Sequence, residues 1–345
     1  MKRSLALLGV LVLVAAGCGG GGNKNSAGTT TTTGGQLPGA GMKVGLVTDV
    51  GGLNDRGFNH LSYVGLQRAK RELGVDTEVF QSKSAGEYVP NLSTFARQGY
   101  DLTIGVGFTE AQAIDTAATR FPDSNFAIVD VDQTQEPNKP ANLLGLLFKE
   151  QETGYLVGYL AGLEEKRRSG PDVIGSVGGQ KQPPVDRFIA GYQAGAKAAD
   201  PGIKVLNGYS QDFADQAKCK QIALNQIEQG AGVIFQVAGG CGLGALDAAK
   251  EQNVWGIGVD ADQAFLGPHI LTSAIKRVDT AVFLAIKSVV EGNFKGGNMI
   301  FGLKENGVGI GKISTKVPNS EVAKVNQVRA DIISGKIKNI PTEVK

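Results

Sequence analysis

The chain has 345 residues, of which 41% are hydrophobic and 20% charged, and its formal net charge is +2. This length is comfortable for two domains, and the composition is typical of a globular protein. A net charge so close to zero gives no indication of a nucleic-acid partner.

The first 18 residues have the pattern of an export signal. Two basic residues precede an apolar run over residues 5–14, which is too short for a stable transmembrane helix. The run ends in Ala-Ala-Gly followed by Cys18, which resembles a bacterial lipobox. We expect residues 1–18 to be a lipoprotein signal peptide with Cys18 as the lipidation site. An ordinary secretory signal is the alternative.

Residues 19–41 form a low-complexity segment that is rich in Gly and Thr. Such a composition cannot bury a core, so we expect a flexible tether with a reach of roughly 25 Å. The sequence therefore predicts a protein that is lipid-anchored to the cell membrane and faces its extracytoplasmic side.

From Met42 onward, apolar strand-like runs alternate with amphipathic helix-like stretches. Expected strands cover residues 43–47, 77–80, 102–106, 126–131, 143–148, 173–177, 204–209, 233–237, 255–259 and 270–275. Expected helices cover residues 59–73, 88–98, 110–120, 150–166, 185–199, 215–229, 243–252, 278–291 and 320–334. Residues 299–314 are Gly-rich and strand-like. The alternation predicts parallel sheets.

Ten strands are too many for one comfortable sheet of this size, and a Gly-Gly turn opens each half of the body, at residues 51–52 and 178–179. We therefore predict an α/β fold of two doubly wound, Rossmann-like lobes joined by a hinge. Residues 143–148 and 270–275 are interpreted as hinge strands. The N-terminal lobe is assigned residues 42–147 plus 276–297, and the C-terminal lobe residues 148–275 plus 298–345.

The loop from Asp49 to Asn59 connects the first strand to the first helix. Ligands of open α/β sheets bind at the carboxyl ends of strands, where this loop lies. Asp49 and Asn59 offer hydrogen-bonding groups and Phe58 offers a flat apolar face. These groups suit a ring-bearing polar ligand such as a nucleoside. The alternative is a capped turn whose Phe58 faces the core.

Further polar residues lie where other strands end. Asp130 and Asp260 each close a strand, and Lys276 ends a hinge segment. A lone Asp at a strand end is more often a helix cap than a ligand contact. Two such carboxylates and an ammonium group facing one cleft, however, suit the vicinal hydroxyls of a ribose.

The second half contains a competing signal. The segment around Gly240 fits the pattern G-x-G-x-x-A, and Asp260 follows about 20 residues later, as in dinucleotide-binding folds. An exported NAD-type oxidoreductase is therefore an alternative. The chain has only two histidines and lacks H-E-x-x-H, G-x-S-x-G and Walker motifs. We predict that the protein is not an enzyme and binds no cofactor and no metal.

Apart from Cys18, the chain contains Cys219 and Cys241. In a β-α-β unit the start of the helix and the end of the following strand lie at the same edge of the sheet. We therefore expect a disulfide between the two, which would brace the loop at Gly239–Gly242. Two buried free thiols are the alternative.

Seven segments of the body, taken together and in order, resemble one protein family. They cover residues 48–59, 126–130, 178–196, 213–218, 238–242, 258–263 and 272–279. They are similar to the BMP (basic membrane protein) family, the PnrA-like nucleoside-binding lipoproteins of bacterial ABC importers. The resemblance extends from about Lys43 to Gly311.

The resemblance implies a type I periplasmic binding protein fold and a monomer that captures purine nucleosides for an ABC permease and its ATPase. It implies that the base lies between Phe58 and Phe213 and that Asp130 binds the edge of the base. It also implies that Asp260 and Lys276 bind the ribose, that Asp49 and Asn59 make further polar contacts, and that Gly240 makes a backbone contact. A sugar or sugar-derived signal is the alternative ligand, because sugar-binding proteins share this fold.

Overall fold

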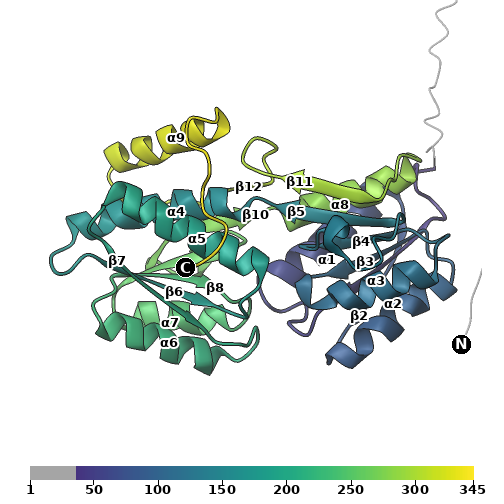
Figure 1. Cartoon of the computed structure of the whole chain (residues 1–345), viewed down its shortest axis with the longest axis horizontal. Coiled ribbons are helices and arrows are strands. Elements are labelled where there is room, and N and C mark those ends of the chain that lie inside the picture. The colour runs from purple at the N-terminus through teal and green to yellow at the C-terminus, as the bar shows by residue number, and fades with distance from the viewer. Residues whose placement is uncertain (1–35) are drawn as a thin grey trace, which may run out of the picture. The chain divides into compact units, whose positions relative to one another are not determined.

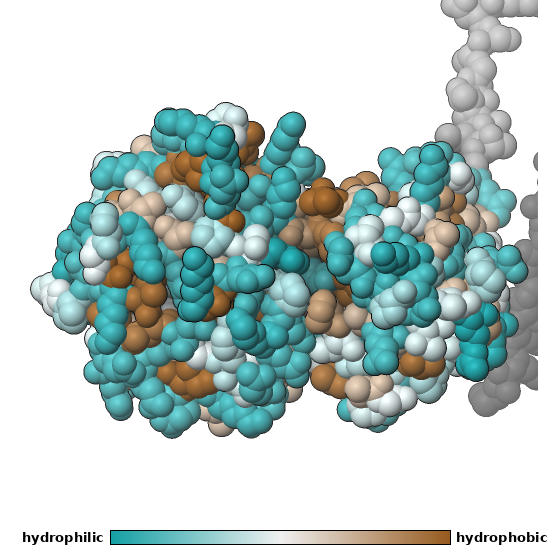
Figure 2. Space-filling model, viewed as in Figure 1, coloured by the Kyte–Doolittle hydropathy of each residue, from teal (hydrophilic) through white to brown (hydrophobic). Residues whose placement is uncertain are grey.

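The computed structural model describes residues 36–345, which form one compact unit of two α/β lobes (Figure 1). The predicted signal peptide, Cys18 and residues 19–35 of the predicted tether lie outside the described residues. No helix within residues 36–345 is long and apolar enough to cross a membrane. In the view of Figure 2, hydrophilic residues cover most of the surface of both lobes.

The first lobe contains a six-stranded parallel sheet with the order β11-β5-β4-β3-β1-β2. Its strands are β1 (Lys43–Thr48), β2 (Asp76–Gln81), β3 (Leu102–Val106), β4 (Phe126–Val129), β5 (Leu143–Phe148) and β11 (Gly297–Phe301). Its helices are α1 (Phe58–Leu73), α2 (Tyr88–Arg97), α3 (Ala111–Arg120) and α8 (Val278–Val290). Helix α1 packs on α8 and helix α2 on α3, and separate apolar clusters lie under the two pairs.

The second lobe repeats this arrangement with the strand order β12-β10-β9-β8-β6-β7, in which only β12 is antiparallel to its neighbour. Its strands are β6 (Val173–Gly178), β7 (Lys204–Tyr209), β8 (Val233–Val237), β9 (Trp255–Asp260), β10 (Ile270–Lys276) and β12 (Val308–Ile310). Its helices are α4 (Glu150–Arg167), α5 (Pro183–Ala199), α6 (Gln216–Glu228), α7 (Gly242–Glu251) and α9 (Asn319–Ile333). Four 3-10 turns complete the described elements: η1 (Ala85–Glu87), η2 (Phe108–Glu110), η3 (Gln133–Gln135) and η4 (Ala264–Leu266).

The central strands are buried because helices cover both faces of each sheet. Every residue of β3, β4, β6 and β8 is buried, as expected for parallel strands between two helix layers. Helices α4 and α5 pack especially closely, since Gly158 of α4 lies directly against the backbone of Tyr192 in α5. This close approach brings the first turns of the two helices together beside the lobe boundary.

The prediction of two parallel α/β lobes is confirmed, and the expected strands and helices are present to within two residues at every end. The interpretation of residues 143–148 and 270–275 as hinge strands is wrong. Both are interior strands, with β5 between β4 and β11 and β10 between β9 and β12. The chain crosses between the lobes directly after each of them and again after β11.

The predicted lobe boundary at residue 297 is also wrong by one strand. Residues 297–301 form β11, which pairs in parallel with β5 and so belongs to the first lobe. Strand β12 then joins the second sheet beside β10. The Gly-rich stretch 299–314 reads as one strand-like segment because nothing local in it shows that its two ends pair with different sheets.

Candidate functional site

A pocket lies between the two lobes and encloses about 630 Å³, including space open to solvent. The structure brings all eight of the predicted ligand residues to its wall: Asp49, Phe58, Asn59, Asp130, Phe213, Gly240, Asp260 and Lys276. They come from strand ends and strand-to-helix loops of both sheets, where binding in open α/β sheets is expected.

The loop between β1 and α1 forms the wall of the first lobe. Asp55 caps the helix, because its carboxylate accepts hydrogen bonds from the backbone amides of Gly57 at 3.0 Å and Asn59 at 2.7 Å. The Asn59 side chain donates to Oδ1 of Asp49 at 2.8 Å, and the Gly51 amide donates to the same oxygen at 2.8 Å. The loop thus holds one Asp49 oxygen from two sides. The Asn59 Oδ1 atom has no hydrogen-bond partner among the described residues.

The two aromatic residues that are expected to stack on a base come from opposite lobes. Phe58 is the first residue of α1, and Phe213 lies in the loop between β7 and α6. A Cβ atom at Gly107 would lie 3.1 Å from the Phe58 ring, and one at Gly179 would collide with the Phe213 ring. Glycine at these two positions therefore leaves room for the rings beside the backbone.

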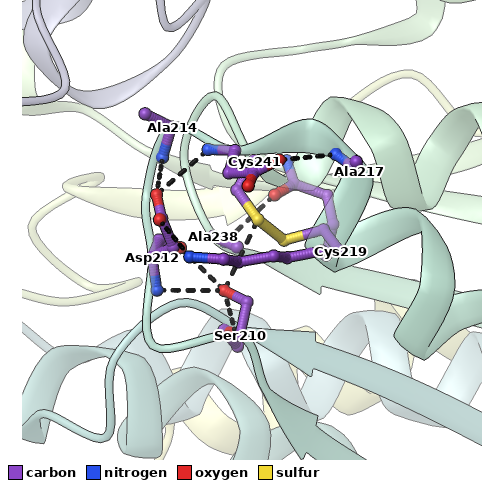
Figure 3. Close-up of a disulfide and its surroundings, with 11 residues drawn as sticks. Ser210, Asp212, Ala214, Ala217, Cys219, Ala238 and Cys241 are labelled. Atoms are coloured by element: carbon purple, nitrogen blue, oxygen red, sulfur yellow. Dashed lines mark hydrogen bonds and ion pairs between the residues drawn. A yellow bond between two sulfur atoms is a disulfide. The ribbon is translucent and has the colours of Figure 1, made fainter.

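A disulfide joins Cys219 near the start of α6 to Cys241 just before α7, with a Cα separation of 5.6 Å (Figure 3). The pairing agrees with the expected β-α-β geometry. The amide of Cys241 donates a 2.9 Å hydrogen bond to the carbonyl oxygen of Phe213. The disulfide therefore secures the residue that holds the Phe213 backbone.

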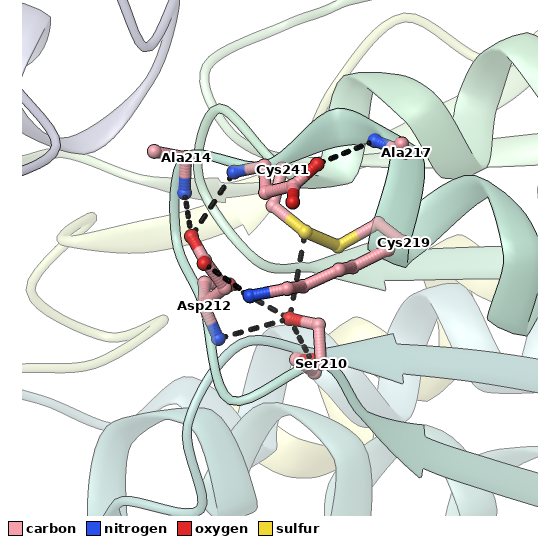
Figure 4. Close-up of polar contacts among 9 residues, drawn as sticks. Ser210, Asp212, Ala214, Ala217, Cys219 and Cys241 are labelled. Atoms are coloured by element: carbon pink, nitrogen blue, oxygen red, sulfur yellow. Dashed lines mark hydrogen bonds and ion pairs between the residues drawn. A yellow bond between two sulfur atoms is a disulfide. The ribbon is translucent and has the colours of Figure 1, made fainter.

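Asp212, which precedes Phe213 in the same loop, holds the loop through its side chain (Figure 4). Its Oδ1 atom accepts hydrogen bonds from the amides of Ala214 at 2.8 Å and Asp215 at 3.0 Å, and its Oδ2 atom pairs with Lys218 at 2.8 Å. Ser210 donates to the Asp212 carbonyl oxygen at 2.7 Å. Phe213 is thus carried on a loop with fixed backbone geometry.

Lys276 is buried at the pocket floor with only 2% of its surface exposed. Its Nζ atom lies 2.6 Å from the Asp130 carboxylate and 2.9 Å from Oε1 of Glu150. The ammonium group also lies 5.1 Å from the ring centroid of Phe58 and 5.7 Å from that of Phe188. Aromatic faces at these distances stabilise a cation.

The strand-end aspartates have unusual backbone and titration properties. Asp130 has φ 71° and Asp260 has φ 62°, a left-handed conformation that Asp tolerates better than most residues. Burial, only partly offset by Lys276, raises the pKa of Asp130 to about 6 and that of Asp260 to about 7. Burial likewise raises the pKa of Asp49 to about 6, despite its hydrogen bonds from Asn59 and Gly51. The pocket therefore contains three carboxyl groups that titrate near neutral pH.

Burial alone would lower the pKa of Lys276. The carboxylates of Asp130, Glu150 and Asp260 outweigh this effect and raise it. The lysine is therefore a charged ammonium group in the pocket at neutral pH.

Sequence reasoning missed several residues of this site. Gln182, Val185 and Phe188 from the start of α5 line the pocket, as does Thr109 after β3. The Gly-Gly turn at the end of β6 could have indicated that the start of α5 lines the pocket, because a helix that follows such a turn begins at the carboxyl edge of the sheet. Glu150 behind Lys276 carried no such signal, because it follows a crossover between the lobes.

Comparisons with known proteins agree with this geometry. Residues 42–342 match the family described as ABC transporter substrate-binding protein, PnrA-like. The ABC transporter nucleoside-binding protein BmpA of Lactococcus lactis is 37% identical over 321 residues, covering 86% of this chain and 88% of that protein. An uncharacterized lipoprotein of Pyrococcus horikoshii is 36% identical over 334 residues, covering 89% of this chain and 82% of that protein.

A solved structure shares both fold and sequence. It is that of an ABC transporter solute-binding protein from Aeropyrum pernix, with a TM-score of 0.79 and 30% identity, covering 88% of this chain and 94% of that one. The family match spans nearly the whole described body, and the relatives cover most of the chain at more than 30% identity. The chain therefore belongs to the family of PnrA-like substrate-binding proteins of ABC transporters, as its sequence motifs predicted.

Proposed function

We propose that this solute-binding protein captures purine nucleosides for its ABC permease and ATPase, as a monomer held at the extracytoplasmic face of the membrane by lipid on Cys18. The main support for this proposal is that one pocket combines aromatic rings from both lobes, Phe58 and Phe213, with buried carboxylates and the Lys276 ammonium group. The Lactococcus lactis relative is named a nucleoside-binding protein, which supports the same ligand class.

Different groups in the pocket wall suit the two parts of a nucleoside. Asp49 lies beside the ring of Phe58, since both approach the space next to Gly107. We assign the edge of the base to Asp49 and Asn59, and the base plane to the phenylalanines. Stacking on an aromatic side chain is worth about 1–3 kcal/mol per base in nucleic-acid complexes.

The ribose is assigned to the charged groups around Lys276. Asp260 and Asp130 accept hydrogen bonds from the vicinal hydroxyls, and Lys276 donates to a hydroxyl oxygen. The family resemblance places Asp130 on the base edge, but its carboxylate lies 2.6 Å from Lys276. We therefore propose that Asp130 and Lys276 meet the same part of the ligand.

A thermal-shift panel of purine nucleosides, free bases, ribose, arabinose and NAD tests this function. A ligand at 100 times its dissociation constant stabilises the folded state by about 2.7 kcal/mol. We expect a response to nucleosides that is clearly smaller in Phe58→Ala. It should be kept in Phe265→Ala, because Phe265 is 63% exposed and does not line the pocket. A response confined to sugars, or to NAD, would refute the proposal in favour of those alternatives.

The lipid anchor is tested separately from the ligand. In a bacterial host that processes lipoproteins, the wild-type protein should be recovered in the membrane fraction with a lipid-modified N-terminal cysteine. Cys18→Ser should release the protein in soluble or unprocessed form. Wild-type protein that starts at another residue and carries no lipid would identify an ordinary secretory signal instead.

A further inference from the structure

A line of four alternating charges runs beneath the pocket. The Arg187 Nε atom donates to Oε2 of Glu150 at 2.7 Å, and Oε1 of Glu150 lies 2.9 Å from Nζ of Lys276. The same Nζ atom lies 2.6 Å from the Asp130 carboxylate. Each interior member of the line, Glu150 and Lys276, thus has a partner of opposite charge on either side.

The line connects the two lobes at their crossovers. Asp130 directly follows β4 in the first lobe, and Arg187 lies on α5 in the second. Glu150 is the first residue of α4, just after the first crossover, and Lys276 is the last residue of β10, just before the second. The Glu150–Lys276 ion pair therefore joins two of the three segments through which the lobes are connected.

Burial makes these pairings obligatory. The side chains of Glu150, Lys276 and Asp130 are 0%, 2% and 5% exposed, and that of Arg187 is 22% exposed. Removing one partner of a buried ion pair strongly destabilises the folded protein, because the remaining charge is left unpaired. Glu150 and Arg187 do not line the pocket, although the residue they hold does. Their arrangement is suited to fixing Lys276 rather than to touching a ligand.

We propose that Glu150 and Arg187 are positioning residues for ligand binding. Arg187 holds the Glu150 carboxylate, and Glu150 holds the Lys276 ammonium group against Asp130 across the lobe boundary. Lysine has a flexible four-carbon stem, and ordering it on ligand binding costs conformational entropy. An ammonium group that is already fixed avoids this cost. The inference rests on the proposed function for its ligand, but its geometric part is testable without one.

The ligand-free test uses Asp130 as the reporter. The charges that act on it are Lys276 from β10, Glu150 from α4 and Arg187 from α5, and the Asp260 carboxyl at the end of β9 also interacts with it. Glu150 raises the pKa of Asp130, whereas Arg187 lowers it. Glu150→Gln should therefore lower this pKa because it removes a negative charge, and Arg187→Met should raise it because it removes a positive charge.

Carboxyl ¹³C NMR of aspartate-labelled protein, titrated between about pH 4 and 8, measures both shifts. Asp130→Asn assigns the resonance. Opposite displacements of the Asp130 titration in the two variants would support the line of charges. Displacements in the same direction, or none, would overturn it. Arg187→Met alone decides the matter if Glu150→Gln does not fold.

Binding of a purine nucleoside, measured by calorimetry, tests the functional part. We expect Glu150→Gln to weaken binding by about tenfold or more, as for the loss of a buried charged hydrogen bond. Arg187→Lys, which keeps the cation, should retain more affinity than Arg187→Met. The matched control is Glu165→Gln, because Glu165 lies on the same helix, is 0% exposed and pairs with Arg168 at 2.9 Å.

The outcomes separate the two proposals. Equal loss of affinity in Glu150→Gln and Glu165→Gln would show a general stability effect and overturn the positioning role. Failure of the wild-type protein to bind any nucleoside would overturn the proposed function, while the Asp130 titrations would still decide whether the line of charges exists.

Discussion

Replacing Asp260 by Asn should stabilise the ligand-free protein but weaken its binding of the ligand. Asp260 is 7% exposed and has φ 62°, a conformation that Asn also adopts readily. None of the described residues donates a hydrogen bond to its side chain, and burial raises its pKa to about 7. An ionised Asp260 is therefore a cost to folding that a neutral amide of the same shape removes.

The size of the effect follows from the pKa. An acid whose pKa is raised on folding binds more protons in the folded state between its two pKa values, so stability falls as pH rises through that window. For Asp260 the window runs from its ordinary value of 3.8 to about 7. Between pH 5 and pH 8 the wild-type protein should lose up to about 3 kcal/mol through this group, at 1.36 kcal/mol per pH unit.

Urea unfolding of wild type and Asp260→Asn at pH 5 and pH 8 measures this difference directly. The advantage of the variant should be larger at pH 8 by up to about 3 kcal/mol, whatever its value at pH 5. Asp130→Asn is the matched comparison, with a smaller difference of about 1 kcal/mol because burial raises the pKa of Asp130 only to about 6. An advantage that is equal at the two pH values would refute the reasoning.

Three further outcomes are expected. Phe58→Ala should weaken nucleoside binding by roughly ten- to a hundred-fold in calorimetry, with a nearly unchanged melting temperature; a large loss of stability at unchanged affinity would place the ring in the core. A 2′-deoxynucleoside and a free base should bind more weakly than the ribonucleoside, since a missing hydroxyl leaves buried groups unpaired at a cost of about 1–3 kcal/mol; equal affinities would remove Asp260 and Lys276 from the site. Reduction of the Cys219–Cys241 disulfide should lower unfolding free energy by about 3 kcal/mol and loosen binding through the Phe213 loop; unchanged binding would show that the loop is held without it.

Much of the pocket wall could be predicted from the sequence because parallel sheets impose a simple rule. Asp49 and Asp130 directly follow buried strands and Asp260 ends one, and the carboxyl ends of such strands meet at one edge. The local pattern therefore places these side chains together without knowledge of the tertiary contacts. The disulfide follows from the same rule, since Cys219 and Cys241 flank one helix and the next strand end.

The rest of the site depends on contacts that leave no local pattern. Glu150 approaches Lys276 only because the chain crosses between the lobes directly before the one and after the other. Arg187 reaches Glu150 only because α4 and α5 pack closely along their glycines. Likewise, nothing within residues 297–301 indicates that they pair with β5, about 150 positions earlier in the chain.

That late pairing has a consequence for how the protein acquires its structure. The first lobe receives α8 and β11 only after the chain has passed through β6–β10 of the second. A fragment of residues 36–276 would therefore expose the face of α1 that α8 covers and leave β5 as an open edge. Contacts so distant in sequence also slow folding, because long loops must close before they form. We therefore expect that no single cut in the chain yields the first lobe as an independently folding fragment, because its strands β1–β5 and β11 are separated by the second lobe.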